Sequence, residues 1–174
     1  WLTIVATVVT LLPTLSGTKI APAARARCTR ALIVHCVGLA LALGLNSFGL
    51  SRAAGMTQLL VVLAALLIIQ PILATLLAGK PQLTTATVSV VAGLLWMLSL
   101  CAADAVCAIL GVYPRVVTLL LMPAFVGAGL MQLVTGVLHH LLPTLVGGGP
   151  AKVTLGRKVA DYGGYARLVL INLG

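Results

Sequence analysis

Long apolar runs, separated by short basic segments, dominate this chain. A helix needs about 20 apolar residues to cross the hydrocarbon core of a bilayer, and runs of that length occupy about 31–50, 56–78, 85–111 and 116–145. Shorter apolar runs cover 1–16 and the residues after Arg167. Because backbone groups in hydrocarbon must bond to one another, each run is expected to be a helix. The pattern predicts an all-α fold, a polytopic transmembrane helix bundle of about six spans.

Composition agrees with a protein that has the lipid bilayer as its solvent. Hydrophobic residues make up 61% of the chain and charged residues 7%, which is too little polar surface for a globule in water. We therefore expect one integral membrane domain over residues 1–174. The chain starts at Trp1 inside an apolar run and stops inside another, so we expect the first and last spans to be truncated parts of a longer protein.

The formal charge of +9 follows the topology of the predicted spans. In alternate connecting segments, one side of the membrane holds only Arg52 and Arg115. The other side holds nine basic residues, namely Lys19, Arg25, Arg27, Arg30, Lys80, Lys152, Arg157, Lys158 and Arg167. By the positive-inside rule, loops 17–30, 79–84 and 147–167 are expected to be cytoplasmic. The positive charge thus indicates which loops are cytoplasmic, and we expect no nucleic-acid partner.

Small residues and prolines punctuate the spans. Glycines and alanines recur in the second and fifth predicted spans, where they let helix backbones approach closely; examples are Gly38, Ala42, Gly44, Gly127, Gly129 and Gly136. Pro123 and Pro143 are expected to kink the 116–145 helix. The four cysteines show no metal-ligand spacing.

Three histidines lie inside predicted spans and are candidate cofactor ligands: His35, His139 and His140. His35 is about four residues into its span, and the pair is about six residues from the same predicted membrane face, so their depths match. Imidazoles at one depth could be the axial ligands of a haem or part of a copper site. Three readings stay open: hydrogen bonding to carbonyls or headgroups near the interface, metal or haem ligation, and proton or quinone handling. Asn46 shares a helix face with His35, and Gln132 shares one with His139.

Asp104 is the one acidic residue within a predicted span, because Asp161, the other acid of the chain, follows the last long run. An ionisable side chain in hydrocarbon is a functional candidate by default. Asp104 could be a proton relay, a cation site, or the partner of Arg52 or Arg115 reaching inward. Cys101 and Cys107 flank it at three residues on either side, but three ligands along one helix cannot converge on a single ion.

Two stretches resemble a known family. The run TVVTLLPT at 7–14 and the run HHLLPTLVGGGPAKV at 139–153, followed by Asn172, Leu173 and Gly174, resemble the membrane region of actinobacterial multicopper-oxidase and copper nitrite reductase fusion proteins. Haem-containing membrane proteins of nitric oxide response are a more distant likeness. The chain departs from the family pattern at His139 and His140, where a small residue and an aromatic are usual. The resemblance implies a bacterial plasma-membrane location and an outer cupredoxin domain that would hold copper, absent from this chain.

Two hypotheses of function follow, and they leave open whether the chain is an enzyme. The resemblance implies a membrane anchor of a respiratory copper oxidoreductase. As a haem module, it would pass quinol electrons to the cupredoxin domain or to other membrane subunits. In that case His35 with His139 or His140 would ligate the haem. The alternative is a small-solute or ion transporter in which Asp104 carries a proton or cation, or a non-catalytic scaffold subunit.

Overall fold

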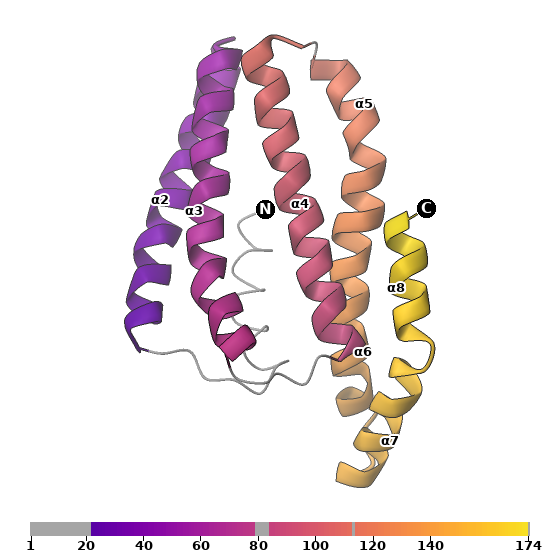
Figure 1. Ribbon diagram of the computed structural model, residues 1–174. Helices are drawn as coiled ribbons and strands as arrows, with labels where there is room; N and C mark the ends of the chain where they lie inside the picture. Colours follow the sequence, from indigo (N-terminus) through magenta and orange to yellow (C-terminus); the bar gives the residue numbers. More distant parts are fainter. Residues whose placement is uncertain (1–21, 79–83, 113, 174) are drawn as a thin grey trace. The chain divides into compact units, whose positions relative to one another are not determined.

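A computed structural model describes residues 22–78, 84–112 and 114–173, and every regular element in these ranges is helical (Figure 1). The apolar run at 1–16 and most of loop 79–84 lie outside the described residues. The elements in chain order are α2 (Pro22–Ser47), α3 (Ser51–Ala78), α4 (Thr85–Leu110), α5 (Pro114–Ala124), the π-helix η1 (Phe125–Met131), α6 (Gln132–Val146), α7 (Pro150–Asp161) and α8 (Gly164–Leu173).

Four segments are long and apolar enough to cross a membrane: Ala26–Ser47, Ser51–Gln70, Thr85–Leu110 and Leu119–Val146. They overlap the four complete runs in the sequence, which confirms an all-α protein with four candidate membrane spans among the described residues. The chain is an integral membrane protein for which a lipid bilayer is the natural surrounding.

Two predicted loops are partly helical, which corrects the sequence prediction. Loop 17–30 was expected to be irregular, yet α2 already begins at Pro22, because proline suits the first turn of a helix and alanine and arginine propagate it. Loop 147–167 contains the helix α7 and the start of α8. Its irregular parts are short: Gly147, Gly148 and Gly149 have positive φ angles, as does Gly163 between α7 and α8.

Pro123 is followed by a change of helix type rather than by a break. It lies inside α5, and the next residues, Phe125–Met131, form the π-helix η1 before α6 continues as an α-helix. Proline has no N–H to donate to the preceding turn, and a π segment is one way a helix absorbs such a defect. The helix thus continues past this proline in a wider register, and the expected kink stays a prediction.

The helices form two compact units, and α4 contributes to both. The first unit contains α2, α3, the part of α4 from Leu98 onward, and α5 up to Pro123. The second unit contains α4 up to Met97, η1, α6, α7 and α8.

In the first unit α2 and α3 run antiparallel and side by side (Figure 1). Two hydrogen bonds show the direction: Cys28 Sγ donates to the carbonyl of Ile68 at 3.5 Å, and His35 lies against the carbonyl of Val61. A Cβ on Gly38 would come 2.7 Å from Cγ2 of Val61, so this glycine permits the close approach predicted for it. Gly44, by contrast, has nothing within 4 Å of such a Cβ.

In the second unit glycines bring α4 against η1 and α6. A Cβ on Gly93 would lie 2.7 Å from the carbonyl oxygen of Gly129, and one on Gly136 would lie 2.8 Å from Cβ of Ser89. The predicted packing role of Gly129 and Gly136 is confirmed, whereas Gly127 faces open space. This is the small-residue packing that membrane helices use where lipid provides little hydrophobic drive.

The last helix, α8, rises along the first half of α4. Gly164 packs against Thr85 at the start of α4, and Trp96 Nε1 donates to Oδ1 of Asn172 at 2.6 Å. Both helices therefore start at the same end of the unit and run in parallel. Asp161 at the end of α7 accepts hydrogen bonds from the backbone N–H and the hydroxyl of Thr85, which places a carboxylate at the N-terminus of α4, where the helix dipole favours it.

Candidate intramembrane binding site

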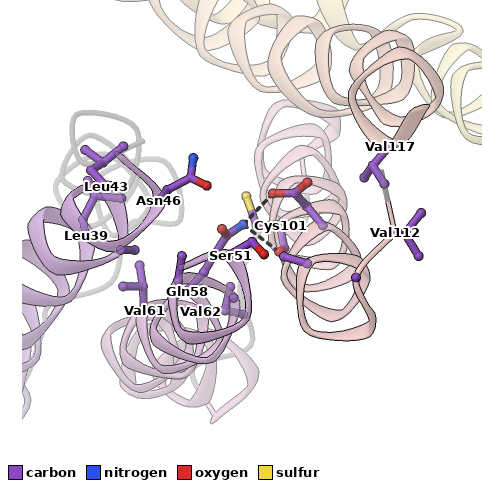
Figure 2. Close-up of a pocket in the computed structure, with 16 residues that line it drawn as sticks. Leu39, Leu43, Asn46, Ser51, Gln58, Val61, Val62, Cys101, Val112 and Val117 are labelled. Carbon is purple, nitrogen blue, oxygen red and sulfur yellow. Dashed lines mark hydrogen bonds between the residues drawn. The ribbon is translucent and has the colours of Figure 1, made fainter. Parts of the chain in front are cut away.

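The first unit contains a pocket of about 500 Å³, here called the Asp104 pocket (Figure 2). A volume of this size is typical of small-molecule sites, which range from about 300 to 1,000 Å³. Residues of α2, α3, the last turns of α4 and α5 line it: Leu39, Ala42, Leu43, Asn46, Ser51, Ala54, Gly55, Gln58, Val61, Val62, Cys101, Asp104, Ala108, Gly111, Val112 and Val117. Most of the lining is aliphatic, and its polar side chains are few.

Asp104 and Gln58 form the polar centre of this pocket. Gln58 Nε2 donates to Oδ2 of Asp104 at 2.9 Å and to the carbonyl of Cys101 at 3.2 Å, and both bonds are drawn in Figure 2. The two hydrogens of one amide group are thereby directed at two acceptors on α4. This arrangement holds the Asp104 carboxylate in one orientation while the residue stays only partly buried.

Close contact between α3 and α4 makes this pairing possible. A Cβ on Gly55 would lie 2.7 Å from the carbonyl oxygen of Ala105, so only glycine lets the two backbones meet here. Gly55 precedes Gln58 by three residues, and Ala105 follows Asp104 directly, so the contact sets the amide and the carboxylate opposite each other. The short side chains of Ala54 and Ala108 leave the space that the pocket occupies.

The pocket lies toward the end of the unit at which α2 ends and α3 begins. Asn46 and Ser51 flank that connection, and Gly111 and Val112 follow the end of α4. Asp104 is six residues before Leu110, or about 9 Å along the helix. The carboxylate is thus about two turns inside the end of its helix.

Among the described residues, Asp104 is bonded by Gln58 rather than by one of the arginines expected to pair with it. Arg52 is exposed, and the oxygen Oδ2 is bonded by Gln58 instead. The side chain of Arg115 lies outside the described residues. The ion pair therefore stays a prediction for Arg115, while a neutral amide donor has been found that charge counting could not reveal.

We predict that Gln58→Leu lowers the stability of the protein by about 1 kcal/mol, in the range of interhelical hydrogen bonds in membranes. The substitution leaves the carboxylate without its amide donor, which costs more than removing both partners. Thermal unfolding in detergent of Gln58→Leu, Asp104→Leu and the double variant forms a double-mutant cycle. Strictly additive losses would show that the two side chains do not interact.

His35 lies in the first unit and is fully buried between α2 and α3. Its Nδ1 lies 3.1 Å from the carbonyl oxygen of Val61; since a carbonyl can only accept, Nδ1 carries the proton in this bond. This contact agrees with the interpretation that the histidine forms a hydrogen bond to a carbonyl group. Asn46, on the same face of α2, lines the Asp104 pocket.

His139, His140 and Gln132 belong to α6 and the second unit. Gln132 is 2% exposed, and the described residues offer no hydrogen-bond partner to either end of its amide or to Nδ1 of His139. Both histidines are half-buried. The nearby Thr135 hydroxyl donates to the carbonyl of Met131 at 2.6 Å, a local bond within the helix.

The predicted haem ligands are divided between the two units, His35 in the first and His139 with His140 in the second. Ligation of a haem by this set stays a prediction, as does a quinol partner. Within the described residues no group of three or more histidine, cysteine, aspartate or glutamate side chains could hold a metal ion. The cysteines there are all free, and Cys101 alone among them lines the Asp104 pocket.

Gln58 is the site residue that the sequence analysis missed. The candidates in the sequence were ionisable side chains in the spans and polar residues that share a face with the histidines. A signal for Gln58 does exist, because an amide inside an apolar run must find a partner in hydrocarbon. Gln58 and Asp104 are 46 residues apart in the chain, so only the packing of α3 against α4 shows that their side chains meet.

Comparisons with known proteins give no match: no protein-family model, no curated protein and no solved structure resembles this chain significantly. The resemblance to the membrane region of copper oxidoreductase fusions therefore stays an expectation. Function has to be argued from the site itself.

Proposed function

We propose that this integral membrane protein binds a small organic cation in the Asp104 pocket and moves it across the membrane. One observation carries the proposal: the single carboxylate among the membrane-spanning helices lines a mostly aliphatic pocket and is held in place by Gln58. A charged group inside a membrane is costly and is retained where it has a task. A carboxylate facing a pocket is suited to attract a cation.

The lining favours an organic over an inorganic cation. A calcium ion takes about 6 to 8 oxygen ligands, whereas the polar side chains around the pocket are Asn46, Ser51, Gln58, Cys101 and Asp104. An amine needs only one carboxylate and one or two acceptors for its charged end. Its hydrocarbon part would contact Leu39, Leu43, Val61 and Val62. Burial of apolar surface in this contact would favour binding by about 25 cal/mol per Å².

Access to the pocket fits a transport role. The pocket lies near the end of the unit that carries Arg52, and the positive-inside rule assigns this end to the outer face. A solute could therefore enter from outside and meet the carboxylate about two turns deep. The transport proposal needs only the Asp104 pocket, whereas the haem and quinol hypothesis needs His35 and the His139–His140 pair at one site.

The proposal is tested with three small molecules of one shape and different charge: benzylamine, benzyl alcohol and benzoate. Each is added to the purified protein in detergent and unfolding is followed by heating. Ligand binding to the folded state stabilises it by about 2.7 kcal/mol at 100 times the dissociation constant, so benzylamine is expected to raise the unfolding temperature. Equal effects of all three molecules would contradict a site selected by charge.

A further inference from the structure

The helix α7 carries a surface that the rest of the second unit leaves exposed. None of its residues is buried. Leu155 is 62% exposed and Val159 68% exposed, and because they are four residues apart they lie on one side of the helix. Lys152 and Lys158 lie three residues before and after Leu155 and are both exposed. An apolar strip with a lysine on either side of it thus faces away from the protein.

The rest of α7 is fixed to the ends of two spans. Gly156 packs against the ring of Pro143 near the end of α6, where a Cβ would lie 3.0 Å from Cβ of the proline. At its other end Asp161 bonds to Thr85, the first residue of α4. Within the second unit α7 therefore lies beside the end of α6 and the start of α4 (Figure 1). Because both helices belong to candidate membrane spans, lipid headgroups are expected at this level.

The exposed charged side chains of α7 are all basic. Arg157 is exposed on α7 as well, while Asp161, the one acidic residue of the helix, is engaged by Thr85. Arg167 is occupied in holding α8 to α7, since its Nη2 donates to the carbonyls of Ala160 and Tyr162. Lys152 and Lys158 are thus exposed cations beside an apolar strip, the combination that binds helices to anionic membrane surfaces.

We propose that α7 is an interfacial helix that binds anionic lipid headgroups of the same leaflet. Leu155 and Val159 enter the boundary between headgroups and acyl chains, and the flanking lysines lie along that boundary with their ammonium groups at lipid phosphates. The charge pattern assigns loop 147–167 to the cytoplasmic side, where anionic lipids are concentrated. This role is independent of the Asp104 pocket, which belongs to the other unit.

The first test measures lipid preference by native mass spectrometry. The full chain is purified with equal parts of phosphatidylglycerol and phosphatidylcholine, and bound lipids are counted. A basic residue near an anionic surface contributes about 1 kcal/mol, so the double variant Lys152→Gln with Lys158→Gln is expected to reduce the preference for phosphatidylglycerol on the order of 30-fold. The matched control is Arg27→Gln with Arg30→Gln, which removes two exposed charges from α2.

The control should keep the wild-type preference. An equal loss in both double variants would overturn the proposal, because it would show a diffuse charge effect, and so would an unchanged preference in the lysine variant. A second measurement follows amide hydrogen exchange of 150–161 in lipid nanodiscs. We expect slower exchange with phosphatidylglycerol than with phosphatidylcholine alone, and Leu155→Asn should remove the difference. Equal exchange in both lipids would also overturn the proposal and would favour a protein partner for this face.

Discussion

Replacing Asp104 with asparagine is expected to reduce binding and uptake of a small organic cation by roughly 100-fold or more. Asparagine has the same shape and can still accept the hydrogen bond from Gln58 Nε2, which lies 2.9 Å from Oδ2, so the variant should fold. What it lacks is the charge. Two unit charges about 4 Å apart attract by about 4 kcal/mol at an effective dielectric constant near 20. Dehydration of the cation offsets part of that attraction, and a remainder of about 2.7 kcal/mol corresponds to about 100-fold.

The measurement is uptake of labelled benzylamine into proteoliposomes, together with its effect on thermal unfolding. Cys107→Ala is the matched control, because Cys107 lies on the same helix three residues from Asp104 and does not line the pocket. Asp104→Glu keeps the charge and should keep part of the uptake. If Asp104→Asn transports as well as the control does, the carboxylate is not the cation site and the proposed function is wrong.

Gly93→Ala is expected to destabilise the second unit by up to about 2 kcal/mol. Its new methyl group would lie 2.7 Å from the carbonyl oxygen of Gly129 and 2.9 Å from the backbone nitrogen of Leu133. Neither backbone atom can turn away as a side chain would, so the helices must separate. Overpacking costs about 1 to 3 kcal/mol, whereas the better helix propensity of alanine returns at most about 1 kcal/mol. The steric effect therefore prevails.

Gly127→Ala provides the matched comparison, since nothing lies within 4 Å of a Cβ at that position. The same substitution there should be neutral or slightly stabilising. Both variants are compared with the wild type by thermal unfolding in one detergent. Equal stability of the two variants would mean that α4 and η1 are not packed as closely as the structure places them.

The helical fold could be predicted well from hydropathy, while the connecting segments could not. The expected run at 85–111 corresponds to α4 at Thr85–Leu110 almost residue for residue. The Gly-rich and basic composition of 147–167 is typical of a loop, yet residues 150–161 form α7. An amphipathic helix at an interface has neither the apolar run of a span nor the irregularity of a loop, so counting apolar residues overlooks it.

The candidate site was predicted in part. Asp104 was identified by its cost in hydrocarbon and Asn46 by its helical phase, and both line the pocket. Their relation to Gln58 was not foreseen, because the rotation of α3 against α4 is set by the contact of Gly55 with Ala105. The choice of partner for a polar side chain depends on which neighbour comes within about 3 Å, and such a distance is not a property of any local stretch of sequence.

By itself, the sequence determined that this chain is an integral membrane protein, that it has four long apolar spans, and which connections carry the positive charge. These are local properties, since hydrophobicity and charge act on each segment separately through the surrounding lipid. Only the tertiary structure decided that Gln58 holds Asp104, that a pocket opens beside them, and that α7 leaves Leu155 and Val159 exposed. Those features depend on where small residues let helices touch, and therefore on pairs of residues far apart in the chain.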